Sequence, residues 1–200
     1  MSSLDFLGER WYNFSKKNLK GFWSPMILDE TYVSASAVEL ASDLIGKVLC
    51  RSIDGTVERR RILETECYFG EEDTACHAHK GQTPRTEIMY RAGGRAYVYL
   101  CYGIHHLLNL TTGPQGHPEA VLIRGVDGAI GPGRVTKLLR IDRSFNTQLL
   151  IPENRLWIED DGVRLSQISL PRVGIGYASR EDQERKWRYV AWEKAKGNEK

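Results

Sequence analysis

The stretch VERRRILETECYF, residues 57–69, is rich in β-branched and aromatic side chains and alternates in the way a β-strand does. Successive side chains of a strand point to opposite faces of its sheet. The alternation therefore assigns Ile62, Glu64, Glu66 and Tyr68 to one face, and Leu63, Thr65 and Cys67 to the other. Two glutamates on one strand face, beside a tyrosine, are either a solvated surface or a reactive site.

The chain continues from this strand as GEEDTACHAHKGQTPR, residues 70–85, which adds cysteine, two histidines and further carboxylates. Four interpretations fit the mixture: a metal site, a thiol nucleophile, a carboxylate that activates water, or a polar connection without chemistry. A zinc site needs ligand pairs on elements that aim both at one point, and Cys76, His77 and His79 are not spaced in that way. The adjacent His105 and His106 point to opposite faces of a strand. We therefore expect no metal.

A cysteine nucleophile would need a neighbouring base and an electropositive pocket. Cys76 directly precedes His77, so the two side chains diverge in an extended segment, and a structural cysteine is the favoured interpretation. The carboxylates remain. A carboxylate beside aromatic side chains can hold a water molecule and act as a general base. Two glutamates on one face suggest one catalytic and one supporting group, and the alternation does not say which is which.

The composition is that of a globular protein. The chain has 200 residues, of which 41% are hydrophobic and 27% charged, and a formal net charge of +2. This suits one domain with its own core. The small positive charge permits an anionic partner without requiring one. The first residues, MSSLDFLGERWYNF, lack the features of a signal peptide, and no run is apolar and long enough to span a bilayer. We expect the four cysteines to be reduced and mostly buried in a cytosolic protein.

The remaining elements follow from local patterns. Residues 34–49 have helical periodicity, and Ser36 with Glu39 resembles a capping box. The run RAYVYLCYGIHHLLNLTT, residues 95–112, predicts a hairpin that turns at Tyr102 and Gly103. Further strands are predicted at 120–126, 155–160 and 172–178, a short helix follows GPG at 131–133, and residues 180–200 are predicted to be helical or frayed. Residues 1–27, which mix aromatic side chains with lysines, are predicted to form an N-terminal arm. The whole predicts one mixed α+β domain, residues 28–200, around a mostly antiparallel sheet with a protruding hairpin.

Two surface features could contact nucleic acid. A tyrosine at a hairpin tip, Tyr102, either lies over a neighbouring loop or serves as a wedge between DNA bases. The segment GPGRVTK places backbone N–H groups at a helix start beside Arg134 and Lys137, which is a candidate phosphate contact, although many helices begin after glycine.

The segments together are more specific than any one of them. In order along the chain they are LASDLIGKVL (40–49), ETECYFGEEDTACHAHKGQTPR (64–85), AYVYLCYGIHHLLNLTT (96–112), AVLIRGV (120–126), GPGRVTKLLRI (131–141), PRVGIGYA (171–178) and KWRY (186–189). This series resembles the 3-methyladenine (alkyladenine) DNA glycosylase family, the mammalian type without a helix-hairpin-helix, over about residues 28–190. The resemblance implies a single domain around a curved antiparallel sheet, an open barrel similar to the C-terminal domain of formyltransferases. It also implies a monofunctional base-excision repair enzyme that releases damaged purines.

Site residues follow position by position from the resemblance. Glu66 in ETECY matches the water-activating base, Arg124 in LIRG matches an arginine that orients the water, and the carbonyl of Val173 would also hold that water. Gly174 would meet a phosphate. Tyr102 matches the intercalating tyrosine.

The resemblance also implies a pocket for the extruded base. Tyr68 and His77 match residues that stack on one face of that base, Tyr99 matches the aromatic residue on the other face, and Asn109 matches a residue that clashes with the 2-amino group of guanine. The implied partner is double-stranded DNA containing damaged purines, with no cofactor, no membrane association and a monomeric state. The location would be cytoplasmic in a bacterium and nuclear in a eukaryote. The alternative is a non-catalytic nucleic-acid-binding module of the same fold.

Overall fold

The computed structural model describes residues 25–192. Ten strands in this part of the chain form one antiparallel sheet, with neighbours in the order β1-β8-β2-β3-β6-β5-β4. Off this path, β7 pairs with β6, and β10 pairs with both β3 and β9. The bounds of the strands are β1 Met26–Ile27, β2 Val48–Ile53, β3 Thr56–Phe69, β4 Ala96–Cys101, β5 His105–Thr111, β6 Glu119–Val126, β7 Ala129–Ile130, β8 Leu156–Asp160, β9 Gln167–Leu170 and β10 Arg188–Ala191. The predicted α+β class is confirmed.

The helices are short. Their bounds are α2 Glu30–Val33, α3 Ala37–Asp43, α4 Pro132–Leu138 and α5 Arg180–Glu184, with 3₁₀ turns at His77–Lys80, Glu87–Tyr90, Arg143–Phe145 and Pro152–Asn154. No helix among residues 25–192 is long and apolar enough to cross a membrane. The predicted aromatic arm falls largely on residues 1–24, which lie outside the described part, and the domain boundary at residue 28 stays a prediction.

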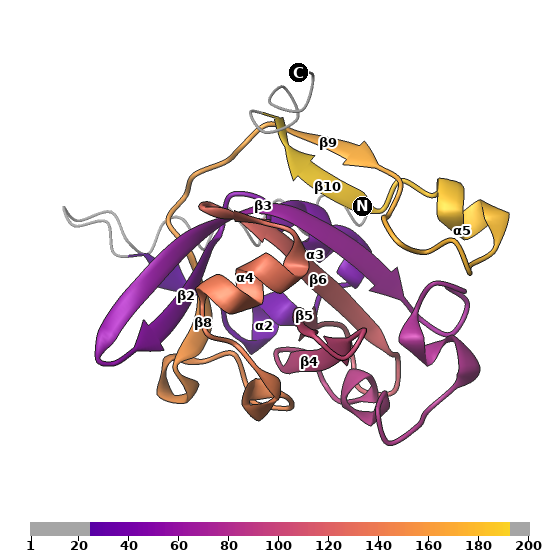
Figure 1. Ribbon diagram of the computed structural model, residues 1–200, viewed down its shortest axis with the longest axis horizontal. Helices are drawn as coiled ribbons and strands as arrows, with labels where there is room; N and C mark the ends of the chain where they lie inside the picture. The colour runs from indigo at the N-terminus through magenta and orange to yellow at the C-terminus, as the bar shows by residue number, and fades with distance from the viewer. Residues whose placement is uncertain (1–24, 193–200) are drawn as a thin grey trace, which may run out of the picture.

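The long strand β3 organises the sheet (Figure 1). Its first half pairs with β2, and its second half lies between β6 and β10. The register against β6 shifts between Ile62 and Glu64 and again between Glu64 and Thr65. Such irregularities bend a strand and re-aim its side chains. The uninterrupted alternation that grouped Ile62 with the glutamates is therefore wrong at this point, because Ile62 lies in the main hydrophobic core.

Beyond the shift, alternation divides β3 as predicted. Cys67 lies in the main core, and the hydroxyl of Thr65 donates to the carbonyl of Ala41 in α3. Glu66 and Tyr68 face the opposite side. The same division runs through the neighbouring strands, where one side of the sheet faces a core shared with α2, α3 and α4. The other side carries a smaller cluster that includes Tyr97 of β4.

Three predicted elements need correction. The helix predicted over residues 34–49 ends at Asp43, because the chain turns through Gly46 at φ +93° and enters β2 at Val48. Residues 172–178 form bends and turns, not a strand. Residues 180–200, predicted as helical or frayed, contain the single turn of α5 and then β10, which adds to the sheet beside β3. The hairpin, the strands near 120–126 and 155–160, and the helix after Gly131 are confirmed.

Candidate active site

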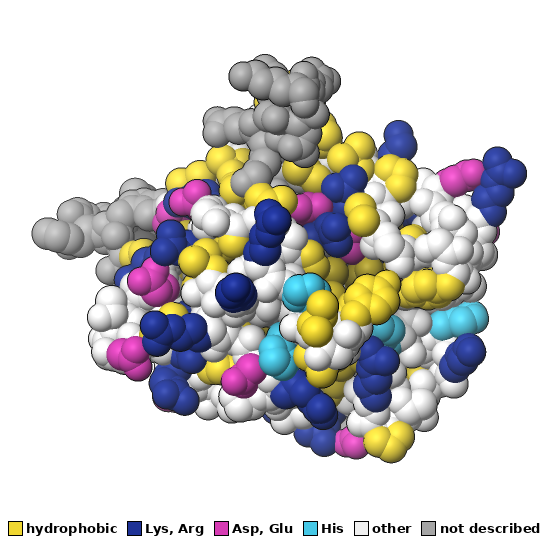
Figure 2. Space-filling model, in the orientation of Figure 1, with side chains coloured by type: hydrophobic (Ala, Val, Ile, Leu, Met, Phe, Trp, Pro, Cys, Tyr) yellow, Lys and Arg dark blue, Asp and Glu magenta, His cyan; other side chains and the backbone are white. Residues whose placement is uncertain are grey.

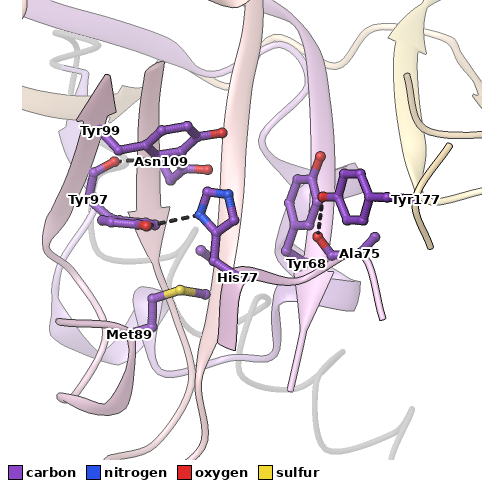
Figure 3. A pocket seen from close by; sticks show the side chains of 9 residues that line it. Tyr68, Ala75, His77, Met89, Tyr97, Tyr99, Asn109 and Tyr177 are labelled. Atoms are coloured by element: carbon purple, nitrogen blue, oxygen red, sulfur yellow. Dashed lines mark hydrogen bonds between the residues drawn. The ribbon is translucent and has the colours of Figure 1, made fainter. Parts of the chain in front are cut away.

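A pocket lies on the side of the sheet opposite the main core. Strands β3 to β6 form its floor, and the segments 75–89 and 171–178 form its walls (Figure 3). Its lining residues are mostly aromatic: Tyr68, Ala75, His77, Met89, Tyr97, Tyr99, Asn109, Ala120 and Tyr177. An aromatic pocket with a few polar groups is typical of a site that binds a flat ring system.

Glu66 is fully buried and adjoins this pocket through Tyr68. The hydroxyl of Tyr68 donates to Oε2 of Glu66 at 3.0 Å, and the backbone N–H of Val173 donates to Oε1 at 2.9 Å. Nε of Arg124 lies 3.6 Å from the same Oε1. Burial raises the pKa of Glu66 above its ordinary value, while Arg124 and the two hydrogen bonds oppose that rise. A buried carboxylate with a raised pKa and fixed orientation is suited to general-base chemistry.

Glu64 has a different environment on the same strand face. Its Oε1 accepts from Nε of Arg124 at 2.8 Å and from Nη1 of Arg188 at 3.0 Å. Both of these arginines come from strands that flank β3, since Arg124 lies on β6 and Arg188 on β10. Glu64 thus orients the guanidinium that stands beside Glu66, which gives it a supporting position that the sequence left unassigned.

His77 lies between two groups of tyrosines in the pocket (Figure 3). Its Nδ1 lies 2.9 Å from the hydroxyl of Tyr97, and its ring meets Tyr99 edge-on at 4.6 Å between centroids and an angle of 71°. Nη2 of Arg85 lies 3.3 Å from Nε2 of His77. Burial, and secondarily Arg85, lower the pKa of His77 to about 4. The imidazole is therefore neutral near pH 7 and offers the face or edge of an uncharged ring.

Asn109 is fixed at the floor of the pocket. The side chain is buried, and its Nδ2 donates to the carbonyl of Tyr97 on the adjacent strand at 3.0 Å. The rings of Tyr97 and Tyr99 lie 5.4 Å apart on the same face of β4, as the alternation predicted. The structure thus brings together four of the predicted base-binding residues, namely Tyr68, His77, Tyr99 and Asn109.

Tyr102 stands at the tip of the β4–β5 hairpin. It is 91% exposed and has φ +50°, followed by Gly103 at φ +72°. Leu100 and Ile104 beside it are also exposed. A tyrosine with left-handed backbone is uncommon, and here the turn directs its ring away from the body of the protein. The alternative in which Tyr102 packs over a neighbouring loop is therefore wrong.

The rival chemistries find little support. No group of three or more His, Cys, Asp or Glu within residues 25–192 could hold a metal ion. His79 instead places Nδ1 2.6 Å from the carbonyl oxygen of Glu71. The four cysteines are free, three of them are buried, and burial raises the pKa of Cys76 to about 12. A thiol with so high a pKa is a poor nucleophile.

The predicted phosphate contacts are exposed. Arg134 and Lys137 are exposed on α4, and the backbone of Gly174, at φ +79°, has open space within 4 Å on the side where a β-carbon would project. Figure 2 shows Lys and Arg side chains, with some Asp and Glu, spread around a central group of hydrophobic and histidine side chains on the face that it draws. The predicted phosphate contacts therefore lie on accessible parts of the molecule.

Comparison with known proteins decides the family. The family described as methylpurine-DNA glycosylase matches residues 31–130 and 127–195. A protein of Psychrobacter cryohalolentis is 48% identical over 169 residues, which cover 70% of this chain and 80% of the relative. A Methanocella arvoryzae protein is 37% identical, with 82% and 91% covered, and a Borreliella afzelii protein is 38% identical, with 81% and 94% covered. All three are named "Putative 3-methyladenine DNA glycosylase".

The chain belongs to the methylpurine-DNA glycosylase family. It is a DNA glycosylase, an enzyme of base-excision repair that acts on DNA, and the interpretation as a non-catalytic binding module is set aside.

Several residues around the glycosylase pocket were not found from the sequence. Tyr97 and Tyr177 line it, Arg85 contacts His77, and Arg188 holds Glu64. Alternation along β4 puts Tyr97 on the same face as Tyr99, so it could have indicated that Tyr97 lines the pocket. The others come from loops or from β10, and they reach the pocket through folding of distant segments.

Proposed function

We propose that this glycosylase hydrolyses the N-glycosidic bond of alkylated or deaminated purines in duplex DNA, with Glu66 as the base that activates water. The observation that carries the proposal is the buried Glu66 carboxylate, hydrogen-bonded at both oxygens, directly beside an aromatic pocket. Candidate substrates are 3-methyladenine, 7-methylguanine, hypoxanthine and ethenoadenine.

For purines alkylated at N3 or N7 the chemistry needs one carboxylate, whereas a neutral lesion such as hypoxanthine must also gain a proton, for which we assign no residue. Alkylation at N3 or N7 gives the purine a positive charge, so it leaves as a neutral base without a general acid. Glu66 accepts a proton from water, the water oxygen bonds to C1′ of the sugar, and the C1′–N bond breaks with its electron pair going to the base. The ionised carboxylate also stabilises positive charge on the sugar. Sugar hydrolases usually need two carboxylates because their leaving groups require protonation. Arg124 and the carbonyl of Val173 would orient the water. Without a lysine nucleophile, the strand stays intact.

Reaching C1′ requires the nucleotide to leave the duplex. In this proposal Tyr102 enters the stack in place of the base, and the base stacks between Tyr68 with His77 on one side and Tyr99 on the other. Carbon atoms of stacked rings meet at about 3.5 Å, so a base between two rings needs about 7 Å. The 4.6 Å between His77 and Tyr99 is too narrow. These two rings must therefore move apart when a base stacks between them.

Selection would combine three effects. A damaged base costs less to unpair, the tyrosines favour an electron-poor ring, and Asn109 rejects the 2-amino group of guanine. Arg134, Lys137 and the backbone at Gly174 would contact phosphates. We also infer that the enzyme acts as a monomer in the compartment that holds the DNA, the cytoplasm if the source is bacterial and the nucleus if it is eukaryotic. Size-exclusion chromatography with light scattering tests the monomer.

The test uses end-labelled duplexes that carry hypoxanthine, ethenoadenine or 3-methyladenine, followed by alkali to cleave abasic sites. The wild-type enzyme should yield cleaved strand only after alkali. Glu66→Gln should abolish release and leave DNA binding nearly intact. Glu64→Gln, a matched change two residues away, should slow release by about tenfold to a hundredfold. It weakens the ion pair that orients Arg124 but leaves Glu66, the proposed general base, in place. Retained turnover in Glu66→Gln would refute the assignment of the base.

A further inference from the structure

Behind the pocket, Arg172 and Asp73 form an ion pair in which both side chains are fully buried. Nη1 of Arg172 lies 2.5 Å from Oδ2 of Asp73, and Nη2 lies 2.8 Å from Oδ1. Nη1 also donates to the carbonyl of Cys67 in β3 at 2.8 Å. The planar guanidinium therefore binds the carboxylate with both arms, an arrangement that fixes orientation as well as distance.

This pair fastens two pocket walls to each other. Asp73 also accepts from the backbone N–H groups of Phe69 at 3.2 Å and Ala75 at 3.0 Å, so it holds the segment that leads to His77. The opposite wall, residues 171–178, carries Arg172. A second tie lies close by, where the hydroxyl of Tyr177 donates to the carbonyl of Ala75 at 2.9 Å (Figure 3).

Arg172 is in direct contact with both groups that donate to Glu66. Val173 follows it in the chain, and the Val173 N–H donates to Oε1 of Glu66. The Arg172 guanidinium carbon lies 5.0 Å from the ring centre of Tyr68, whose hydroxyl donates to Oε2 of Glu66. The buried Arg172 guanidinium thus positions both the backbone of Val173 and the ring of Tyr68.

Building on the function proposed above, we propose that the Arg172–Asp73 pair is the positioning element of this site, which holds the Val173 N–H and the Tyr68 hydroxyl against the Glu66 carboxylate. Neither Arg172 nor Asp73 lines the pocket itself, and in this assignment neither touches the reacting atoms. The pair acts through the two donors.

The groups around Glu66 define what a loss of this pair changes. Arg124 from β6, Glu64 and Tyr68 from β3, Arg188 from the paired position on β10, and Val173 and Tyr177 from the 171–178 segment face the carboxylate. Substitution of Arg172 leaves all of these groups in the chain. Arg172→Met also removes a buried cation and leaves Asp73 without its counter-charge, whereas Arg172→Lys keeps the charge and disturbs the placement of the two donors. Hydrogen bonds to the ionised form lower a carboxyl pKa. Their loss therefore moves the Glu66 pKa upward.

A titration that does not depend on activity tests this directly. In protein labelled with ¹³C at the glutamate carboxyl carbon, the Glu66 signal is identified by its absence from Glu66→Gln. We expect its titration midpoint to rise by about one pH unit in Arg172→Met. The rise should be smaller in Arg172→Lys, because lysine keeps the positive charge but lacks the planar guanidinium that binds Asp73 with two nitrogens. The matched control is Lys47→Met. Lys47 is equally buried, lies 3.0 Å from Asp160, and is not part of the site.

Arg172→Met should lower the melting temperature by roughly 10 °C, because it leaves the buried Asp73 carboxylate without its cation. Lys47→Met should lower it by less, because Asp160 keeps its ion pair with Arg164. A higher Glu66 midpoint in Arg172→Lys, which keeps the charge, but not in Lys47→Met supports the inference. An unchanged midpoint in Arg172→Met, or an equal shift in Arg172→Lys and Lys47→Met, overturns it and reduces the pair to a structural role. If Arg172→Met does not fold, the midpoint in Arg172→Lys decides, and an unchanged value there also overturns the inference.

A kinetic measurement separates this inference from the proposed function. The acidic limb of the kcat/KM profile reports the base of the free enzyme. With 7-methylguanine, whose charge is fixed, this limb should move to higher pH in Arg172→Lys by the same amount as the NMR midpoint. Absence of wild-type release would refute the proposed function while leaving the NMR result valid for the pair. If the wild-type enzyme releases the base but Arg172→Lys changes neither the acidic limb of the kcat/KM profile nor the NMR midpoint, only the positioning role of the Arg172–Asp73 pair is refuted.

Discussion

Glu64 and Glu66 are chemically identical and two residues apart, yet their partners give them different roles. Glu64 binds two arginines through one oxygen, whereas Glu66 accepts two uncharged donors and lies 3.6 Å from Arg124. The two arginines hold the Glu64 carboxylate in a network of ion pairs. Neutral donors in a buried place leave a carboxylate that can exchange a proton. Strand alternation could place both glutamates on one face but could not distinguish them.

His77 provides a prediction at the residue scale. Its pKa is about 4 in the folded protein and near 6.5 when unfolded, so the unfolded state binds more protons between these values. The contribution of His77 to the free energy of unfolding is fully present above pH 6.5. It is lost as the pH drops toward 4, by up to about 3 kcal/mol. Urea unfolding at several pH values measures the loss. In His77→Gln the loss over this window should be smaller, and an identical loss would contradict the lowered pKa as its cause.

At the scale of elements, the β4–β5 hairpin exposes Tyr102 at its tip. Tyr102 is exposed and has no packing role, so Tyr102→Ala should leave the melting temperature within about 1–2 °C of wild type. If Tyr102 replaces the extruded base, the variant should lose about tenfold in affinity for a damaged duplex and much less for a single strand, which has no stack to fill. Fluorescence anisotropy with both ligands makes the comparison. Equal losses would count against the wedge.

Helix α3 depends on its N-cap because it has only seven residues. The hydroxyl of Ser36 accepts from the N–H of Val38, so Ser36→Ala should cost about 1 kcal/mol in the free energy of unfolding. Ser42→Ala is the control within the same helix. The Ser42 hydroxyl donates to the backbone carbonyl of Glu39 at an exposed position, so its loss should change the free energy of unfolding by less than about 0.5 kcal/mol. Comparable losses in both variants would show that capping is not the cause.

Elements with strong local patterns could be predicted, and those that depend on distant partners could not. The alternation of β3 and β4, the apolar run of β6 and the turn at Tyr102 and Gly103 are encoded locally. The segment at Val173 alternates like a strand, but its N–H binds the Glu66 carboxylate instead of a neighbouring strand. In β10, Arg188 pairs opposite Glu66, 122 positions earlier in the chain. No local pattern indicates such a pairing.

At the scale of the whole molecule, a net charge of only +2 means that DNA binding must come from the local arrangement of charges. Each phosphate contact contributes about 0.9 to the slope of log K against log salt concentration. Arg134→Ala and Lys137→Ala should therefore each reduce the magnitude of this slope by about 1, with little change in preference among lesions. Arg59→Ala is the control, because Arg59 pairs with Glu159 at the β2–β8 side of the sheet. An unchanged slope in both α4 variants would remove α4 from the DNA interface.

The order of residues is enough to specify the α+β class, the central strand with its two faces, the hairpin that turns at Tyr102 and Gly103 and, through the succession of motifs, the family resemblance. These features rest on local alternation, turn chemistry and residue identity, all of which are written in consecutive residues. Folding in three dimensions decides which glutamate binds two arginines and which accepts from Val173 and Tyr68, how β3 bends between Ile62 and Glu64, and how Arg172 and Asp73 join the two pocket walls. Those outcomes depend on burial and on partners about a hundred residues apart, which the linear order of side chains does not specify.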